Sequence, residues 1–177
     1  MKISSEFSKH ALEYNTYNII QNKVVKQLLS KLNYKPKSIL DLGCGSGALC
    51  KSIDWEYEYF LGVDFAKGML ELHPKSKNIN CIYGNFNDTS LFENLATYEF
   101  EHVFSSSSLQ WAQDLESVFK SISSLKRPIS LAIFTSGTFK TLNKTANLKS
   151  LLRSASTIQT LSEKYFNAEY EVLKYKL

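Results

Sequence analysis

The sequence predicts an α/β fold, a Rossmann-like and doubly wound sheet whose strands are mostly parallel. Apolar segments of strand length alternate with helical segments over residues 38–135, an order that right-handed crossovers fold into such a sheet. The first apolar segment runs into Gly43, Gly45 and Gly47, which let the backbone turn tightly beside a nucleotide. With 177 residues, 44% of them hydrophobic, the chain is expected to form a single domain.

The N-terminal residues 1–36 are expected to form a helix that covers the sheet. Apolar side chains recur at near-helical spacing over residues 5–32, so one face of this helix can pack against the strands. Phe7, Tyr14 and Gln21 follow one another at seven-residue intervals and therefore share a face. Phe7 fits a core position, and Tyr14 fits a core or a substrate-contacting position equally well. Gln21 meets either solvent or a specific hydrogen-bond partner, which we expect to be the cofactor.

The central residues 37–135 form the expected cofactor-binding core. The expected strands cover residues 38–42, 57–63, 79–83, 100–105 and 129–135, and the expected helices cover residues 48–53, 66–73, 91–96 and 114–125. Pro36 and Pro74 each follow a helical segment, which a proline does not continue. The connections between strands are therefore long enough for parallel crossovers.

The glycine-rich turn and the residue before it indicate which ligand binds there. The glycine spacing fits both dinucleotides and S-adenosylmethionine, so the glycines alone do not decide between them. Asp41 would face the anionic pyrophosphate of a dinucleotide, but it suits a ligand that carries an ammonium and a sulfonium. We therefore expect S-adenosylmethionine, or its product S-adenosylhomocysteine, to lie against Asp41 and a loop that comprises Gly43, Cys44, Gly45 and Gly47.

Polar side chains also follow the second and third strands, at the edge where open parallel sheets bind ligands. Asp64 lies 19 positions beyond Gly45 and can accept hydrogen bonds from both ribose hydroxyls, with Phe65 directly after it. The alternative role for Asp64 is to cap the next helix, and both roles are compatible if different oxygens serve them. Asn85 and Phe86 are expected to meet the adenine ring through an amide and through a backbone N–H or an aromatic face.

A serine-rich turn follows the fourth strand. Ser105 and Ser106 are expected to contact the cofactor at the carboxyl edge of the sheet. The candidates for contacting the methyl acceptor are Tyr14, Tyr17, Gln110 and Trp111. His10, His73 and His102 lack the partner spacing of a catalytic triad or a metal site, so no metal is expected.

The motif D-L-G-C-G-S-G around Gly45 resembles the first motif of the class I S-adenosylmethionine-dependent methyltransferases. Together with S-S-S-L-Q-W-A-Q-D-L and the spacing of Phe7, Tyr14 and Gln21, it makes most of the chain similar to the malonyl-acyl-carrier-protein O-methyltransferase family of biotin synthesis. The resemblance implies methyl transfer to the free carboxylate of a malonyl thioester on an acidic carrier protein. An ionised carboxylate needs no general base, so alignment and desolvation are the expected catalytic effects.

Residues 136–177 depart from that family and are expected to form an incomplete C-terminal part. They comprise a polar helical stretch over residues 141–164 and a strand-like tail over residues 170–177. The resemblance implies a further antiparallel strand that this sequence lacks, so the tail is expected to be an unpaired edge that invites self-association. Because a cover over the acceptor is also missing, the chain is expected to bind cofactor but to turn over poorly.

The composition and charge of the chain limit the binding partners and the cellular compartment that we expect. The net charge of +4 is too small and dispersed for nucleic-acid binding, but an acidic partner could dock at Lys126 and Arg127 or at the lysine-rich tail. The three cysteines show no metal-ligand spacing and indicate a reducing cytoplasm. No apolar run is long enough for a signal peptide or a membrane span. A methyltransferase for another small acceptor, a cofactor-binding protein with little turnover and a nicotinamide-dependent dehydrogenase stay open as alternatives.

Overall fold

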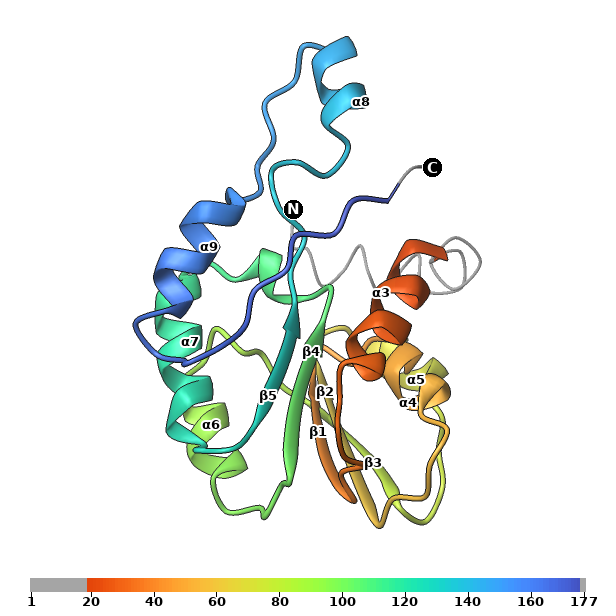
Figure 1. The fold of residues 1–177 in the computed structure, drawn as a ribbon. Helices are drawn as coiled ribbons and strands as arrows, with labels where there is room; N and C mark the ends of the chain where they lie inside the picture. The colour runs from red at the N-terminus through yellow and green to blue at the C-terminus, as the bar shows by residue number, and fades with distance from the viewer. Residues whose placement is uncertain (1–18, 176–177) are drawn as a thin grey trace.

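The computed structural model describes residues 19–175, and it confirms the predicted α/β fold (Figure 1). All strand pairs of its five-stranded sheet are parallel, and the strand order is β3-β2-β1-β4-β5. The strands are β1 (Ser38–Leu42), β2 (Tyr59–Asp64), β3 (Ile79–Tyr83), β4 (His102–Ser106) and β5 (Ile129–Ala132). The order reverses between β1 and β4, and such a reversal opens a ligand-binding crevice at the carboxyl ends of the strands.

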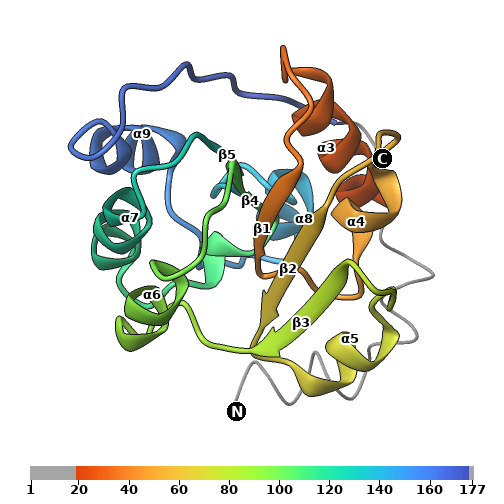
Figure 2. The ribbon, with the colours of Figure 1, turned by 90° about the horizontal axis from the view of Figure 1, so that it is seen from below.

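Helices cover both faces of the sheet. One face is covered by α3 (Ile19–Ser30), α4 (Ala48–Ser52) and α5 (Lys67–Leu72), and the other by α6 (Ser90–Leu95), α7 (Leu115–Ser124) and α9 (Ala155–Ser162) (Figures 1 and 2). A short 3-10 turn, η1 (Leu109–Trp111), follows β4, and α8 (Lys140–Thr145) lies beyond β5, away from both layers. The result is a three-layer arrangement in which the crevice lies at one end of the sheet.

The core is buried on both faces of the sheet because successive side chains of a strand point to opposite sides. Ile39 packs in the cluster beneath α3 and α4, together with Phe60 and Phe104. Its neighbour Leu40 packs in the larger cluster beneath α6 and α7. This double burial explains why the strands appear in the sequence as nearly continuous apolar runs.

The element bounds differ from the sequence prediction mainly toward the C-terminus. The strand β5 ends at Ala132, three residues earlier than expected, and two short helices, α8 and α9, occupy part of the predicted helical stretch 141–164. Of the predicted N-terminal helix, the structure describes the part that forms α3; residues 1–18 lie outside the described residues.

The expected strand in the tail is wrong for residues 170–175, which form no regular secondary structure. Side chains hold this segment to α9 and to the turn after α3: the Ser162 hydroxyl donates to the Tyr170 hydroxyl at 3.1 Å, and Lys31, which directly follows α3, pairs with Glu171 at 2.8 Å. A strand would instead need a neighbouring backbone to satisfy its N–H and C=O groups. The expected self-association, which depended on such a strand, stays untested.

Candidate functional site

The loop between β1 and α4 is held by its own backbone against the end of β2. The amides of Gly43 and Cys44 both donate to the Val63 carbonyl, at 2.7 and 3.0 Å. The φ angles of Gly43, Gly45 and Gly47 are 78°, 53° and 86°, in the left-handed region that side chains disfavour. The alternate glycines of the sequence are therefore required by the path of this backbone.

The three glycines differ in what surrounds them. A Cβ atom at Gly43 would collide with the side chain of Ser108, and one at Gly47 would collide with Pro74. A Cβ atom at Gly45 would meet no atom of the described residues within 4 Å. The loop thus packs against the protein at its two outer glycines and leaves open space at the central one.

Asp64, at the end of β2, is a buried carboxylate that organises this loop. Its Oδ2 accepts a hydrogen bond from the Gly45 amide at 2.9 Å, and its Oδ1 accepts one from the Ala66 amide at 2.8 Å. Burial raises the pKa of Asp64 above its ordinary value, although these backbone donors act against the rise. Each carboxylate oxygen carries two lone pairs, so Asp64 can hold the loop and the start of α5 and still accept hydrogen bonds from a ligand.

Asp41, in β1, lies at the bottom of the crevice and is buried. Its pKa is raised to about 7, mainly by burial; the charge of His73 opposes the rise and the charge of Asp64 adds to it. Within the described part of the chain the carboxylate of Asp41 has no hydrogen bond to offset its burial. A cationic group of a ligand would supply that compensation.

The exit of β4 is tied to the end of β1 by two serines. The hydroxyls of Ser105 and Ser108 lie 2.7 and 2.9 Å from the Leu42 carbonyl and 2.7 Å from each other. Ser105 is buried and its side chain points inward, so its role in this structure is to join the two strands.

The next two hydroxyls behave differently. The oxygens of Ser106 and Ser107 are buried and have no hydrogen-bond partner among residues 19–175. Ser107 also has a left-handed backbone, with φ 58°, which is held by a 2.7 Å hydrogen bond from Gln110 Nε2 to the Ser107 carbonyl and a 2.8 Å bond from its own amide to the Ala132 carbonyl. Strain of this kind costs on the order of 1 kcal/mol and is concentrated at functional sites.

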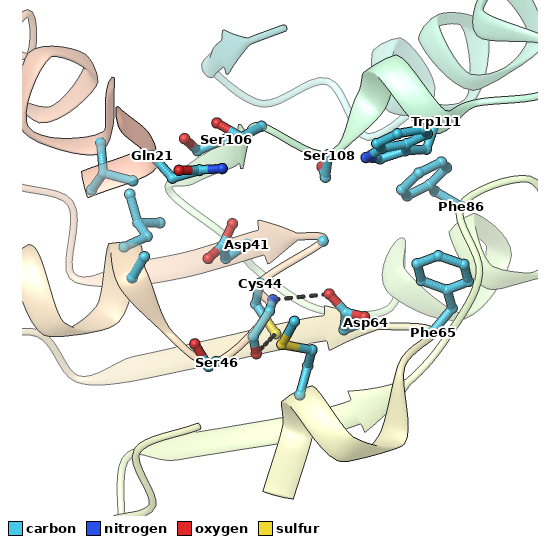
Figure 3. A pocket seen from close by; sticks show the side chains of 17 residues that line it. Gln21, Asp41, Cys44, Ser46, Asp64, Phe65, Phe86, Ser106, Ser108 and Trp111 are labelled. Atoms are coloured by element: carbon cyan, nitrogen blue, oxygen red, sulfur yellow. Dashed lines mark hydrogen bonds between the residues drawn. The ribbon is translucent and has the colours of Figure 1, made fainter. Parts of the chain in front are cut away.

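A pocket opens at this end of the sheet, between the glycine loop, the β4 exit and α3 (Figure 3). Its lining comprises Gln21, Val25, Asp41, Gly43, Cys44, Gly45, Ser46, Ala48, Leu49, Asp64, Phe65, Met69, Phe86, Ser106, Ser107, Ser108 and Trp111. Figure 3 shows a polar end with Gln21, Asp41 and Ser106 and an aromatic end with Phe65, Phe86 and Trp111. The pocket therefore suits a ligand that is polar at one end and carries a flat ring at the other.

A family model with the description "Methyltransferase domain" matches residues 40–134, more than half of the chain. The chain belongs to this methyltransferase-domain family. Its cofactor is S-adenosyl-L-methionine, in agreement with the prediction from the glycine loop and Asp41.

Curated relatives of this methyltransferase include two bacterial proteins that are both named malonyl-acyl-carrier protein O-methyltransferase. The protein from Legionella pneumophila is 30% identical over 149 residues, which cover 80% of this chain and 52% of the relative. The protein from Acetivibrio thermocellus is 32% identical over 141 residues, which cover 76% of this chain and 49% of the relative. The chain thus spans about half the length of the curated relatives it matches.

Solved structures show the same fold. A methyltransferase of Haloferax volcanii in complex with the activator Trm112 has a TM-score of 0.74 at 15% identity and covers 93% of this chain and 75% of its own. An S-adenosyl-L-methionine-dependent methyltransferase of Methanococcus maripaludis has a TM-score of 0.66 at 14% identity, and the match covers 98% of this chain and 89% of the Methanococcus chain. These likenesses extend the fold assignment over nearly the whole methyltransferase chain.

The groups that line the pocket fit S-adenosyl-L-methionine. The space beside Gly45 leaves room for a ligand against the backbone, and the buried carboxylate of Asp41 suits a cationic group. Asp64 has free lone pairs for ribose hydroxyls, and the aromatic end, with Phe65 and Phe86, suits adenine.

Many of the residues predicted from the sequence to contact ligands line the pocket. They are Gln21, Asp41, Gly43, Cys44, Gly45, Asp64, Phe65, Phe86, Ser106 and Trp111. Four predicted residues lie outside the lining, namely Gly47, Asn85, Ser105 and Gln110. Asn85 uses its amide oxygen within its own turn, where it accepts from the backbone and side-chain nitrogens of Asn87 at 3.0 and 2.9 Å. Tyr14 and Tyr17 lie outside the described residues.

Sequence reasoning missed several lining residues. Ser107 and Ser108 stand in the same serine run as the predicted Ser106, so the run itself was the available signal. Ser46 lies between two of the predicted glycines. The apolar lining, Val25, Ala48, Leu49 and Met69, has no sequence signal that distinguishes it from core residues.

The described histidines serve the packing of the methyltransferase. His102 lies between the Tyr34 hydroxyl, 2.6 Å from Nδ1, and the Ser130 hydroxyl, 2.9 Å from Nε2, and burial lowers its pKa to about 4. His73 donates from Nδ1 to the Pro74 carbonyl at 2.9 Å. Among the described residues, no cluster of histidine, cysteine and carboxylate side chains could hold a metal ion, and no helix is long and apolar enough to cross a membrane.

Proposed function

We propose that this chain carries the methyltransferase domain of an O-methyltransferase that acts on the free carboxylate of malonyl-acyl-carrier protein. The curated relatives at 30% and 32% identity bear that name. The serine-rich turn that follows β4 and the Trp111 of the L-Q-W sequence, on which the resemblance depended, form one wall of the pocket.

In this proposal the cofactor lies along the pocket, from its polar end to its aromatic end. Asp41 and Gln21 hold the methionine part, Asp64 holds the ribose, and the rings of the aromatic end hold the adenine. When bound, the cofactor supplies an electrophilic methyl group. The work of the protein is then to bring a nucleophile into line and to exclude water from it.

The observation that carries the proposal is the chemistry of the described lining. It includes no lysine, histidine or tyrosine that could act as a general base, and its two carboxylates lie where the cofactor is expected. An amine or alcohol acceptor would need its proton removed, whereas a carboxylate with an ordinary pKa near 4 is already ionised at neutral pH. The described lining therefore favours a carboxylate acceptor.

Such an acceptor must approach from the side of the serines, because Asp41 and Asp64 would repel it. The unpartnered hydroxyls of Ser106 and Ser107 are neutral donors in that wall. Neutral donors orient a carboxylate without the strong stabilisation that a lysine or arginine would give, so they leave it nucleophilic. Gln110 acts as a positioning residue here, since its amide holds the left-handed backbone of Ser107.

The test is to incubate the protein with S-adenosylmethionine and malonyl-acyl-carrier protein and to measure the carrier by intact-mass spectrometry. A mass increase of one methylene unit that an esterase removes while the thioester stays intact supports methyl ester formation. Acetyl-acyl-carrier protein, which has no free carboxylate, is the control and should stay unmodified. Methylation of other acceptors alone would contradict the proposed substrate, and calorimetric binding of cofactor without any turnover would contradict the proposed activity.

A further inference from the structure

Residues 136–153 form an arm that projects from the domain next to the pocket. At its base the Ser136 amide donates to the Arg153 carbonyl at 2.8 Å, so the two ends of the arm lie side by side. The short helix α8 lies within it, and Figure 1 shows this helix standing clear of the sheet, beyond the carboxyl end of β5. Parallel strands end at the same edge, so the arm rises from the edge that carries the pocket.

One arginine joins the base of the arm to the wall of the pocket. Arg153 Nη2 donates to the carbonyls of Ala112 and Gln113 at 2.8 and 3.0 Å. These two residues directly follow Trp111, which lines the pocket. A molecule that rests on the arm is thereby placed beside the pocket entrance.

The arm has an unusual combination of charge and exposed apolar surface. Residues 117–162 contain no aspartate or glutamate but seven lysines and arginines. Within the arm Lys140, Lys144 and Lys149 are exposed. Three large apolar residues are exposed among them: Phe139 at 60%, Leu148 at 63% and Leu151 at 98%.

We propose that this arm is the docking surface for an acidic protein domain that presents the methyl acceptor to the pocket. The inference rests on the proposed function and assigns the partner's contact to residues 136–153. The lysines complement an acidic surface and speed encounter, while the exposed apolar residues are the kind of patch that marks an interface. This location replaces the docking sites predicted from the sequence, Lys126 with Arg127 and the lysine-rich tail.

A protein partner fits this arm better than a nucleic acid or a lipid surface. Nucleic-acid sites neutralise many phosphates with clustered cations, whereas this arm exposes three spaced lysines interleaved with leucine and phenylalanine. Membrane-surface helices are amphipathic over several turns, whereas α8 has six residues. A small mixed surface with a basic rim is typical of a transient protein interface.

The test compares two triple charge reversals. The first combines Lys140→Glu, Lys144→Glu and Lys149→Glu in the arm. The matched control combines Lys35→Glu, Lys75→Glu and Lys77→Glu, three exposed lysines that precede β1 and β3 and so lie at the opposite edge of the sheet. Both variants change the net charge equally, and neither alters a pocket residue.

We expect the arm variant to raise the KM for malonyl-acyl-carrier protein about ten- to a hundredfold, since three exposed ion pairs, each of which contributes up to about fivefold in affinity, are here made repulsive. The KM for malonyl-pantetheine, which has no protein part, and the calorimetric affinity for S-adenosylhomocysteine should not change. Leu151→Ser should raise the carrier KM about threefold or more without a loss of stability, because this side chain is fully exposed.

An equal KM for malonyl-acyl-carrier protein in the two triple variants would overturn the proposal. Tighter binding of the protein to RNA or to anionic vesicles than to the carrier would overturn it too. Absence of turnover on both malonyl thioesters contradicts the proposed function instead. In that case the calorimetric affinity of the protein for the carrier tests the docking surface independently of turnover. Loss of binding in the arm variant supports the docking surface, and unchanged binding overturns it.

Discussion

The Gly45 amide donates a 2.9 Å hydrogen bond to Oδ2 of Asp64, so one carboxylate at the end of β2 fixes the central glycine of the loop that follows β1. The other oxygen of Asp64 fixes the amide of Ala66 before α5. Three segments of the pocket therefore depend on one side chain. The helix-capping alternative holds only in part, because Asp64 binds the amide of Ala66, which is itself the N-cap residue of α5 and has no side-chain cap. The ribose contact stays a prediction, and it is compatible with these bonds because the amides of Gly45, Ala66 and Phe65 do not use all four lone pairs of the carboxylate.

Replacement of Asp64 by asparagine should weaken cofactor binding. The asparagine side chain has one acceptor oxygen. It can accept a hydrogen bond from the Gly45 amide or from the Ala66 amide, but it cannot keep both bonds and also accept one from a ligand. Charge-assisted hydrogen bonds contribute roughly 1.5–3 kcal/mol, so the Kd for S-adenosylhomocysteine should rise about ten- to a hundredfold in calorimetry.

Asp88→Asn is a matched control for this change. Asp88 also accepts from the amide two residues ahead, that of Ser90 at 3.0 Å, but it lies outside the pocket lining. Its replacement should leave the Kd unchanged. If Asp64→Asn bound as tightly as the control, the assignment of Asp64 to the ribose would be wrong.

The cofactor affinity should depend on the ionisation of Asp41. Its pKa of about 7 means that the free protein holds a proton there below neutrality, whereas a cationic group of the ligand favours the ionised form. Affinity for S-adenosylhomocysteine should therefore fall about tenfold per pH unit below 7 and become level above it. Calorimetry from pH 5.5 to 8.5 measures this dependence.

Asp41→Asn separates this effect from other titrations. The variant should bind more weakly at pH 8 and should lose most of the pH dependence, since the amide does not ionise. A wild-type affinity that does not vary between pH 5.5 and 8.5 would show that Asp41 does not face the cationic part of the ligand.

His102 should make the protein less stable in acid. Its pKa is lowered to about 4 by burial, whereas an unfolded histidine titrates near 6.5. As the pH falls from 6.5 to 4, the unfolded state takes up a proton that the folded state excludes, so the free energy of unfolding decreases, by roughly 1–3 kcal/mol. Above pH 6.5 this contribution is complete and constant.

Urea denaturation of wild type and of His102→Gln at pH 7 and pH 4.5 tests this prediction. The variant should be less stable than wild type at pH 7, where the bonds of His102 to Tyr34 and Ser130 are complete. Its free energy of unfolding should decrease less than that of wild type between pH 7 and pH 4.5. Equal losses in the two proteins would place the acid sensitivity elsewhere, for example at other buried groups.

The parts of the fold that local sequence patterns determine could be predicted. Apolar runs that are buried on both faces identified the strands, and the glycines, whose φ angles are positive, identified the loop. Asp41 and Asp64 were found because each ends an apolar run at the edge where ligands bind. These features depend on a few neighbouring residues.

Contacts between distant segments were not predictable in the same way. The sequence places Ser105 beside Ser106, but it does not show that the first hydroxyl turns toward Leu42 of another strand. Likewise Arg153 meets the Ala112 carbonyl across 41 positions of the chain. The tail was predicted as strand-like from its own residues alone, but a strand also needs a partner, and the sequence pattern does not show one.

Alanine substitutions at Gly43 and Gly45 should separate the part of the loop that supports the fold from the part that meets the ligand. Both residues have left-handed backbones, at φ 78° and 53°, so each alanine is expected to cost on the order of 1 kcal/mol in conformational strain. At Gly43 the added Cβ also collides with Ser108, which is bonded to Leu42, so a further loss of stability should follow. At Gly45 the Cβ meets only open space, so stability should fall by little more than the strain while cofactor affinity falls at least tenfold. Denaturant unfolding and calorimetry on both variants measure the two effects. Normal binding in a folded Gly45→Ala protein would mean that the ligand does not approach this part of the backbone.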